Sequence, residues 1–390
     1  MTKEEADREQ AIAAYLRQES VSAIARKLGH SRVWVYKWIE RYEARKEGEE
    51  WSADRSKRPQ QNSRQLPAET VTAVKLMRQQ LDAEGIFSGA QMIHWELGEL
   101  GLSPMPSLRT IHRILRREGL TERRTGRYEP KGKIYPVLSA AAANEVHQSD
   151  FVGPRYLGKG VRFYSLNSVD IATGRCAVTP QLNKTAQATI DGFWANWCRL
   201  GMPEHQQVDN EMVFYGSHRH PRGMGCLIRL CLTHGIEPWF VPPREPWRNG
   251  VVEKFNDHYQ QGFLRRVAIG RAEDLWPESV AYEQKHNSRY RYSKLHGLTP
   301  QQALGKQRRE IRFPPSTEAP KHPLPRPERG RYHLVRLIPE DGKFDVFGEP
   351  FHAPSNPVYE YVTATIDVAR QKLLLTLNHD VIDEHDYLIR

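Results

Sequence analysis

The sequence predicts a multidomain protein with two N-terminal all-α helix-turn-helix units, an α/β core with a mixed five-stranded sheet, and a small all-β barrel at the C-terminus. Three observations support this fold class. Apolar residues recur at helical spacing in residues 5–45 and 67–120, strand and helix patterns mix after residue 145, and residues 331–390 alternate apolar and polar side chains. A length of 390 residues allows roughly two to four domains.

The domain boundaries follow from these patterns and from two segments of linker composition. Residues 47–66 have little apolar periodicity, and residues 306–330 are rich in proline and basic. The expected organisation is a first helical unit at 1–46, a linker at 47–66, a second helical unit at 67–130 with room for a wing, a core at 140–305, a linker at 306–330 and the barrel at 331–390.

The first helical unit contains a helix-turn-helix pattern. Ala25 is small enough for two helices to cross closely, Gly29 can adopt the left-handed turn conformation, and Ser31 is a good N-cap for the second helix. Val35 and Trp38 would pack inward. The outward face, where a recognition helix reads the DNA major groove, would carry Arg32, Val33, Tyr36 and Lys37. A three-helix bundle that binds no DNA is the alternative, and the small residues around the turn favour DNA binding.

The second helical unit ends in a strongly basic helix. Ser107 is a good N-cap for a helix over residues 108–117. Its apolar stripe would consist of Leu108, Ile111, Ile114 and Leu115. The other face would carry Arg109, Arg113, Arg116 and Arg117. This pattern indicates a second DNA-binding helix-turn-helix, with an amphipathic surface helix as the alternative.

The positive charge of the chain is concentrated in two segments. There are 57 lysines and arginines against 47 acidic residues, which gives a net charge of +10. Residues 109–133 hold nine basic and three acidic residues, and residues 306–331 hold eight and three. Such segments suit a polyanion, because neutralising phosphates releases condensed counterions. Two solvated linkers could have the same composition.

Cysteine content and hydropathy point to a reducing compartment. The four cysteines form no Cys-x-x-Cys pair, no apolar run approaches the ~20 residues of a membrane span, and the polar N-terminus does not match a secretory signal. We therefore expect a cytoplasmic, nucleoid-associated protein with no membrane partner.

From residue 145 the pattern changes to strands mixed with helices. The expected strands are 146–152, 161–170, 175–180, 205–208 and 236–241, and the expected helices are 185–200, 225–231 and 249–267. Three antiparallel strands followed by strands that alternate with helices imply a mixed sheet with helices on its faces.

Three acidic residues lie where such a sheet presents functional groups. Asp150 is inside the first strand, Asp209 ends the fourth strand, and Glu253 is one turn into a helix. Because a charge inside a buried strand needs a partner or a metal ion, these carboxylates are candidate metal ligands.

At these residues the sequence resembles the retroviral-integrase superfamily, in particular the integrase-like DDE transposases of bacterial insertion sequences. The similar motifs are Asp150-Phe-Val-Gly, Asp209-Asn, and Pro243-x-x-Pro-x-x-Asn-Gly-Val-Val-Glu-Lys-Phe-Asn256. Residues 296–304 are similar to the segment that closes the domain, and the likeness extends over nearly the whole chain. The resemblance implies a ribonuclease-H-like integrase catalytic core in which Asp150, Asp209 and Glu253 are the metal-binding triad.

Several positions depart from the family pattern. His147 stands where an aromatic residue is common, and Glu211 stands where a glycine often follows Asp-Asn. No counterpart of the retroviral N-terminal zinc site is present in the sequence. Asp209 and Glu253 are separated by 43 residues (210–252), and we expect the extra length at 212–224 to be a surface insertion. None of these departures removes a metal ligand.

The resemblance and the chemistry of phosphodiester cleavage together imply a transposase. It would bind the ends of a mobile DNA element, cleave their 3′ ends and transfer the strands into target DNA. Two Mg²⁺ ions, with Mn²⁺ as a substitute, can activate the attacking oxygen and stabilise the leaving oxygen. Asp150 would bridge both ions, and Asp209 and Glu253 would each complete one. Lys254 and His258 would contact the DNA end, with solvation as the alternative for both, and pairing two ends implies at least a dimer.

Two other functions are compatible with parts of the sequence. A transposase-derived DNA-binding regulator without catalytic activity is disfavoured by the three retained carboxylates. A structure-selective nuclease on the same fold is disfavoured by the two helix-turn-helix units, which indicate long, sequence-specific contacts.

Two other assignments of ligands also compete. Glu245 lies at the commonest family spacing from Asp209, with 35 residues between them (210–244). It sits between two prolines, so we expect it to point to solvent, whereas Glu253 is held on a rigid helix. A zinc site would have to use His218, His220, Cys226, Cys231 and His234, whose spacing fits no common zinc motif.

Overall fold

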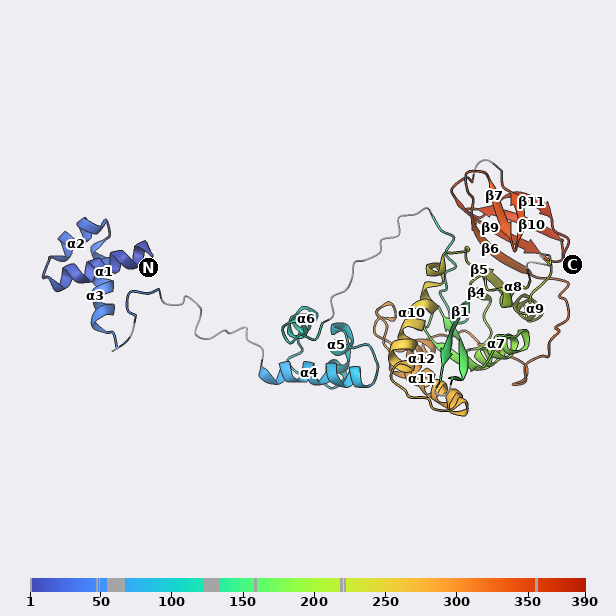
Figure 1. Ribbon diagram of the computed structural model, residues 1–390, viewed down its shortest axis with the longest axis horizontal. Helices are drawn as coiled ribbons and strands as arrows, with labels where there is room; N and C mark the ends of the chain where they lie inside the picture. Colours follow the sequence, from blue (N-terminus) through green and yellow to red (C-terminus); the bar gives the residue numbers. More distant parts are fainter. Residues whose placement is uncertain are drawn as a thin grey trace. The chain divides into compact units, whose positions relative to one another are not determined.

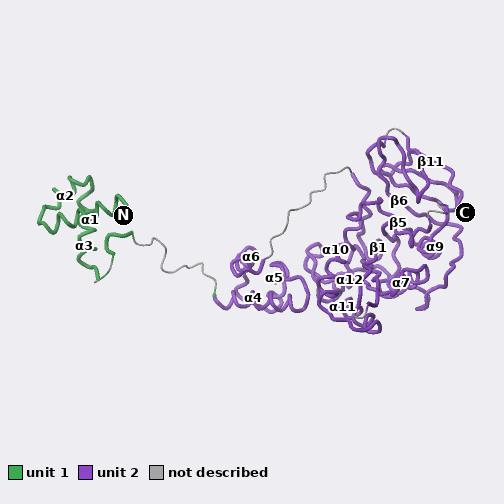
Figure 2. Tube along the Cα trace, in the orientation of Figure 1, with its two compact units in different colours: residues 1–67 green, residues 68–390 purple. Residues whose placement is uncertain are grey.

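The computed structural model describes residues 2–390 except 47, 49, 55–66, 122–133, 158–159, 218–219, 221 and 355–356. The chain forms two compact units, Met1–Pro67 and Ala68–Arg390 (Figure 2). Each unit has its own hydrophobic core.

The first unit is a three-helix domain with a capped turn. It consists of α1 (Lys3–Leu16), α2 (Val21–Leu28) and α3 (Arg32–Glu43). Gly29 has φ 72°, and the Ser31 hydroxyl accepts a hydrogen bond from the amide of Trp34 as the N-cap of α3. Val35 and Trp38 are buried. The expected helix-turn-helix geometry is therefore present.

The first unit extends beyond the expected boundary at residue 46. Trp51 packs edge-on against Tyr42 with ring centroids 5.1 Å apart. The buried Arg8 guanidinium donates to the Ser52 carbonyl at 2.7 Å and pairs with Asp54 at 2.8 Å. A buried guanidinium needs these partners, so residues 51–54 belong to the domain and not to the linker expected at 47–66.

The second unit begins with another group of three helices. They are α4 (Ala68–Ala83), α5 (Ala90–Glu99) and α6 (Leu108–Arg117). Ser107 caps α6 by accepting from the Thr110 amide, as expected. Leu108 differs from the expectation, because it is 38% exposed while the rest of the apolar stripe is buried. The expected wing falls on 122–133, outside the described residues.

A mixed sheet forms the centre of the second unit (Figure 1). Its core strands are β1 (Val146–Tyr156), β2 (Arg162–Asp170), β3 (Cys176–Gln181), β4 (His205–Val208) and β5 (Glu237–Phe240). β1, β2 and β3 pair antiparallel, whereas β4 pairs parallel with β1 and β5 pairs parallel with β4. This pairing confirms the predicted mixed sheet.

The C-terminal strands continue the core sheet instead of forming a separate barrel. The tail contains β6 (Arg331–Leu337), β7 (Lys343–Val346), β8 (Glu349–His352), β9 (Tyr361–Asp367), β10 (Lys372–Leu377) and β11 (Asp380–Asp386). β6 pairs parallel with β5, which gives nine strands in the order β11-β10-β9-β6-β5-β4-β1-β2-β3, and β7 and β8 form a hairpin. The sequence prediction of a five-stranded sheet and a closed barrel is wrong for the described residues. Without β6, strand β5 would be an open edge of the core sheet. One apolar cluster spans Phe240, Leu334 and Ala364 across this junction.

Helices cover both faces of the sheet. One face carries α7 (Ala186–Leu200), α8 (Met212–Tyr215) and α9 (Cys226–Thr233). The other carries η2 (Pro246–Asn249), α10 (Gly250–Tyr259), the π-helical segment η3 (Gln260–Leu264) and α11 (Leu275–Arg289), with α12 (Pro300–Gly305) packed on α11. Two short 3₁₀ turns, η4 (Ala272–Asp274) and η5 (Ser293–Leu295), flank α11. No helix in the described part of the chain has the length and apolarity that a membrane span requires.

The expected proline-rich linker at 306–330 is docked on the core. The Trp194 indole donates to the Ser316 carbonyl at 3.0 Å, and the Arg229 guanidinium donates to the Leu324 carbonyl at 2.8 Å. Leu324 itself is buried in the main apolar cluster. The segment therefore satisfies backbone groups along α7 and α9, which a free linker would leave to water.

The expected surface insertion at 212–224 is also partly buried. It contains α8, whose Phe214 is fully buried and stacks on Phe151 with ring centroids 5.6 Å apart. Arg222 forms a bidentate ion pair with Glu349 of β8. The insertion thus connects the core to the C-terminal strands.

Candidate functional site

Asp150 is presented to α10 by the alternation of strand β1. Phe151 belongs to the apolar cluster under α7, and Val152 belongs to the cluster under α10 and α11. Since alternate residues of a strand share a face, Asp150 lies on the α10 side together with Val152. Gly153 follows at a bulge with φ 131°, where a Cβ atom would lie 3.0 Å from the Phe163 carbonyl oxygen. The bulge re-aims the strand at the edge of the site.

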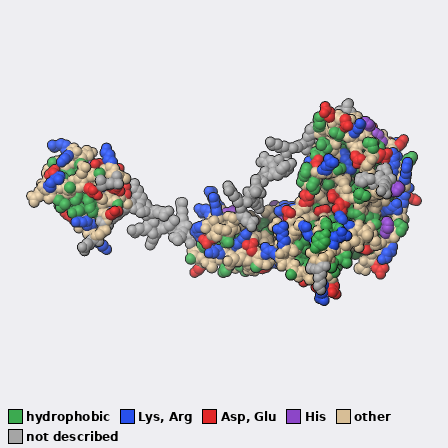
Figure 3. Space-filling view, viewed as in Figure 1, with side chains coloured by type: hydrophobic (Ala, Val, Ile, Leu, Met, Phe, Trp, Pro, Cys, Tyr) green, Lys and Arg blue, Asp and Glu red, His purple; other side chains and the backbone are tan. Residues whose placement is uncertain are grey.

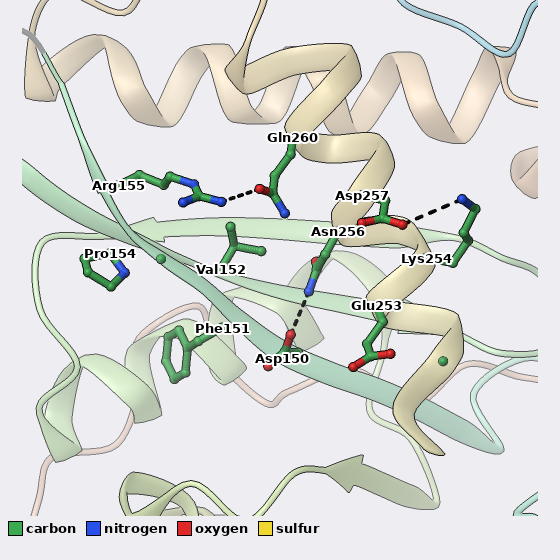
Figure 4. Close-up of a pocket in the computed structure, with 12 residues that line it drawn as sticks. Asp150, Phe151, Val152, Pro154, Arg155, Glu253, Lys254, Asn256, Asp257 and Gln260 are labelled. Atoms are coloured by element: carbon green, nitrogen blue, oxygen red, sulfur yellow. Dashed lines mark hydrogen bonds and ion pairs between the residues drawn. The ribbon is translucent and has the colours of Figure 1, made fainter. Parts of the chain in front are cut away.

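A chain of buried amides holds the Asp150 carboxylate. The Asn256 side-chain amide donates to Asp150 Oδ2 at 2.8 Å (Figure 4). Asn167, the β2 partner of Asp150, donates to Asn256 Oδ1 at 2.8 Å. The Ser165 hydroxyl then donates to Asn167 Oδ1 at 2.7 Å. These bonds fix the Oδ2 atom of the Asp150 carboxylate.

The start of α10 is tied to the strand that carries Asp150. The Gln148 side-chain oxygen accepts from the amides of Val251 at 2.9 Å and Val252 at 3.2 Å, so it caps the helix in place of Asn249. Asn249 instead donates to the Ser149 carbonyl at 3.0 Å. Glu253 follows in the first turn of α10, and its carboxylate points toward Asp150 (Figure 4).

Asp209 lies directly after β4, in a tight polar turn. Its Oδ1 accepts from the Glu211 amide at 3.1 Å. Glu211 in turn forms an ion pair with Lys184 at 2.7 Å. Glu211, which stands where a glycine is common in the family, therefore places a fourth carboxylate beside the site.

The electrostatics show that these carboxylates influence one another. Burial raises the pKa of Asp150 to about 7, and the charges of Asp209, Glu211 and Glu253 add to this rise. Burial also raises the pKa of Asp209 to about 6, with further contributions from Glu211 and Glu253. The pKa of Glu253 is raised by burial first and by Asp257 second. Such a set of desolvated, mutually repelling carboxylates favours a bound cation.

The carboxylate oxygens suit a hard divalent cation, although the three carboxylates do not converge on one point. A cavity of about 640 Å³ lies between β1 and α10 and is lined by Asp150, Glu253, Lys254 and Asn256. Asp209 does not line it, and among the described residues no three His, Cys, Asp or Glu side chains are close enough to hold one ion. Oxygen-only ligands suit Mg²⁺. The predicted convergence of three carboxylates on shared ions is thus only partly present.

Glu245 lies outside this group, in a contact of its own. Its carboxylate accepts from the Tyr361 hydroxyl at 2.7 Å and from the Arg248 guanidinium at 2.9 Å. The prediction that Glu245 stays out of the acidic group agrees with the structure. The prediction that it points freely to solvent is wrong, because its side chain is only 15% exposed.

The predicted DNA-contacting residues of the helical groups are at the surface. Arg32 and Lys37 are exposed on α3, with the Lys37 ammonium 5.6 Å from the centre of the Trp38 ring. The exposed basic residues of α6 are Arg109, Arg113, Arg116 and Arg117. Arg117 pairs with Glu118 at 3.1 Å. Figure 3 shows Lys and Arg side chains projecting from both helical groups.

The two predicted DNA contacts on α10 differ from each other. Lys254 is exposed, lines the cavity and lies 3.7 Å from Asp257. His258 is half-buried, and Phe87 packs edge-on against it at 4.1 Å. Burial lowers the pKa of His258 to about 3, with Lys254 and His286 adding to the effect. The partial burial and the lowered pKa of His258 argue against a charged contact from this side chain to a DNA phosphate.

The two cysteines of the rival zinc cluster have other roles. Cys231 is fully buried in the main apolar cluster, and the Cys226 thiol donates to the Val213 carbonyl at 3.1 Å. His218 lies outside the described residues.

Sequence reasoning missed the polar side chains that support the acidic residues. Asn256 was visible as the last residue of the third motif, three positions after Glu253, but its role was not assigned. Gln148 and Asn167 gave no signal, because polar residues inside strands are read as solvent-facing unless their pairing partners are known. Glu211 was noticed only as a departure from glycine.

Comparison with known proteins gives one family model and several solved structures. Residues 2–50 match the model of a homeodomain-like domain, which confirms the predicted helix-turn-helix. No curated protein matches the chain. The chain is similar to the HTLV-2 integrase catalytic core domain in complex with magnesium. The trimeric form gives 19% identity, TM-score 0.33, and coverage of 43% of this chain and 99% of that chain. The dimeric form gives 18% identity, TM-score 0.32, and coverage of 43% of this chain and 100% of that chain.

A third similar structure is an intasome of simian T-cell lymphotropic virus in complex with the PP2A regulatory subunit B56 gamma. It is 15% identical with TM-score 0.36, and it covers 76% of this chain and 93% of that chain. Because these TM-scores are low, the architecture of the core is established by its own strand pairing and not by these matches.

Proposed function

We propose that this chain is a DDE-type transposase. It binds the ends of a mobile DNA element, cleaves their 3′ ends and joins them to target DNA. Asp150, Asp209 and Glu253 hold two Mg²⁺ ions, for which Mn²⁺ can substitute. A homeodomain-like domain at the N-terminus and an acidic cavity between β1 and α10 support this proposal.

The acidic cavity is the observation that carries the proposal. Asp150 and Glu253 reach it from two different elements, and Asp209 lies close enough for its charge to raise the Asp150 pKa. A stabilising role for three such carboxylates without a cation is implausible, because each is desolvated beside the others. Structural carboxylates at this depth would instead pair with arginine or lysine.

The residues of the site have separate tasks. When bound, the two ions activate the attacking water or 3′-hydroxyl and stabilise the leaving oxygen. Asp150, held by Asn256, lines the cavity and would be one of the residues that hold the ions. Glu253 is fixed by the capped start of α10, and Asp209 by its own turn. Lys254 at the cavity edge can bind a DNA phosphate.

DNA binding is assigned to the exposed basic faces. Arg32 and Lys37 on α3 would contact base edges, since they flank the major-groove side of a capped recognition helix. The basic face of α6 would bind the phosphate backbone of the DNA at a second position. Two element ends must be paired for joining, so we infer at least a homodimer on DNA.

A DNA-binding regulator without catalysis is the second candidate. The incomplete approach of the three carboxylates favours it. The two functions make different predictions for the same assay, because a regulator binds the ends without cleaving them.

The test is cleavage of oligonucleotides taken from the DNA that flanks the gene. With Mg²⁺ or Mn²⁺, the protein should release the 3′ end and transfer it to a second duplex. Asp150→Asn should bind the same ends with unchanged affinity and leave them intact. Specific binding without cleavage by the unmodified protein would favour the regulator, and absence of specific binding would contradict both functions.

A further inference from the structure

A compact polar cluster connects the C-terminal sheet to the turn that precedes α10. Tyr361, the first residue of β9, donates its hydroxyl to the two oxygens of Glu245 at 2.7 and 2.9 Å. The Arg248 guanidinium donates to Glu245 Oε2 at 2.9 Å and to the Tyr361 oxygen at 3.2 Å. Both side chains of the Glu245–Arg248 pair are largely buried, so these bonds are shielded from water.

Aromatic rings hold the guanidinium from two sides. The Arg248 guanidinium carbon is 4.0 Å from the centre of the Tyr135 ring and 5.0 Å from that of Tyr361. The two tyrosine rings contact each other edge to face at 5.2 Å. Arg248 is therefore fixed by an ion pair, a hydrogen bond and two cation–π contacts, far more than an exposed loop arginine normally has.

Arg248 is followed directly by the residues that begin α10. Its carbonyl accepts from the Gln207 side chain at 3.0 Å, and Asn249 donates to the carbonyl of Ser149. Glu253 comes one helical turn later. A shift of Arg248 would therefore move the start of α10 and the carboxylate of Glu253 with it.

The C-terminal sheet also touches the turn that carries Asp209. The buried Arg336 of β6 donates to the Asn210 side-chain oxygen at 3.3 Å and to the Asp345 carbonyl at 2.7 Å. Asn210 in turn donates to the Val241 carbonyl. The C-terminal strands thus contact the turn that carries Asp209 and the turn that precedes the helix of Glu253.

We propose that Tyr361, Glu245 and Arg248 are positioning residues of the acidic site, through which the C-terminal sheet fixes the start of α10 and directs Glu253 toward Asp150. The C-terminal strands are then part of the catalytic unit. Glu245, the carboxylate at the commonest family spacing, acts as an acceptor for Tyr361 and Arg248 and not as a metal ligand. This inference rests on the proposed function for its link to catalysis.

Hydrogen exchange in the metal-free protein tests the positioning role without any activity. The variants are Tyr361→Phe, which removes one hydroxyl, and Glu245→Gln, with Glu340→Gln as the matched control on an exposed turn of the same sheet. Loss of a buried hydrogen bond should speed exchange of the amides of residues 247–253 about five- to tenfold. Exchange of α7 and of the control should match the unmodified protein. Unchanged exchange at 247–253 in both variants would overturn the proposal.

The Mg²⁺ requirement of cleavage tests the link to Glu253. In Tyr361→Phe the Mg²⁺ concentration for half-maximal 3′-end cleavage should rise about five- to tenfold, with DNA affinity unchanged. The double variant with Glu245→Gln should be little worse than the poorer single variant, because both remove the same contact. A purely structural defect would lower the amount of active protein and leave the Mg²⁺ dependence as it is, which would contradict the proposal.

The two hypotheses fail in different ways. If the unmodified protein binds element ends and does not cleave them, the proposed function fails, and the exchange experiment still decides whether the cluster fixes the start of α10. If the unmodified protein cleaves and the variants keep its Mg²⁺ dependence and exchange, only the positioning role fails.

Discussion

Removing the Gln148 side chain should destabilise the start of α10 from inside the sheet. Gln148 is 5% exposed, and its oxygen accepts from two amides of the first helical turn, those of Val251 and Val252. Gln148→Ala would leave both amides without a partner in a region that water reaches poorly. The substitution leaves the three proposed metal ligands in place, so it separates helix positioning from metal binding.

The size of the effect follows from the two lost bonds. Loss of a helix cap costs about 0.5–2 kcal/mol, and a buried donor left unpaired costs about 1–3 kcal/mol. Because local relaxation can admit water to one amide, we expect a loss of about 2–3 kcal/mol in the free energy of unfolding of the second unit. Gln80→Ala, at an exposed position of α4 with a single contact to Glu84, should change it by less than about 0.5 kcal/mol.

Urea unfolding followed by tryptophan fluorescence, together with 3′-end cleavage, measures both consequences. Gln148→Ala should lower the unfolding midpoint and reduce cleavage more than DNA binding. If Gln148→Ala is as stable as Gln80→Ala and cleaves normally, then the contact of Gln148 with the start of α10 does not position this helix.

Three further predictions concern DNA binding, metal and pH. Arg32→Ala with Lys37→Ala should weaken binding to the element ends, by about 1–3 kcal/mol for a bidentate base contact at Arg32, and an unchanged footprint would contradict the assignment of α3. Cleavage should need Mg²⁺ or Mn²⁺ and survive a zinc-selective chelator, whereas loss of cleavage on zinc removal alone would implicate His220 or Cys226. Burial lowers the pKa of His286 to about 4. The unfolded chain therefore binds the proton first, so stability is fully present above about pH 6.5 and falls by up to about 3 kcal/mol toward pH 4. His286→Gln should flatten that slope in acid unfolding, and an equal slope in both proteins would refute it.

The elements of the molecule that follow from local spacing could be predicted from the sequence. The turn at Gly29, the caps at Ser31 and Ser107, and the five core strands lie where residue patterns placed them. Asp150 and Glu253, which line one cavity, could be named as candidate ligands because strand position and a specific motif pointed to them. These features depend on neighbours within one or two turns of chain.

The features that could not be predicted depend on pairing between distant segments. Alternation in the tail is the same for a barrel and for strands that join an existing sheet, so the pairing of β6 with β5 was invisible. The proline content of residues 306–330 predicted a linker. In the structure, the carbonyls of Ser316 and Leu324 accept hydrogen bonds from side chains of the core. The partners of Glu245 also lie far along the chain, at Tyr361, and its surroundings suggested only an exposed loop.

Glu253, and not Glu245, should complete the acidic triad with Asp150 and Asp209. A side-by-side 3′-end cleavage assay at saturating Mg²⁺ tests it most directly, with DNA binding measured on the same samples. Asp150→Asn, Asp209→Asn and Glu253→Gln should each bind element ends and fail to cleave them. Glu245→Gln should cleave at saturating Mg²⁺, because it alters the position of α10 and removes no ligand. Cleavage by Glu253→Gln together with an inactive Glu245→Gln would contradict the account.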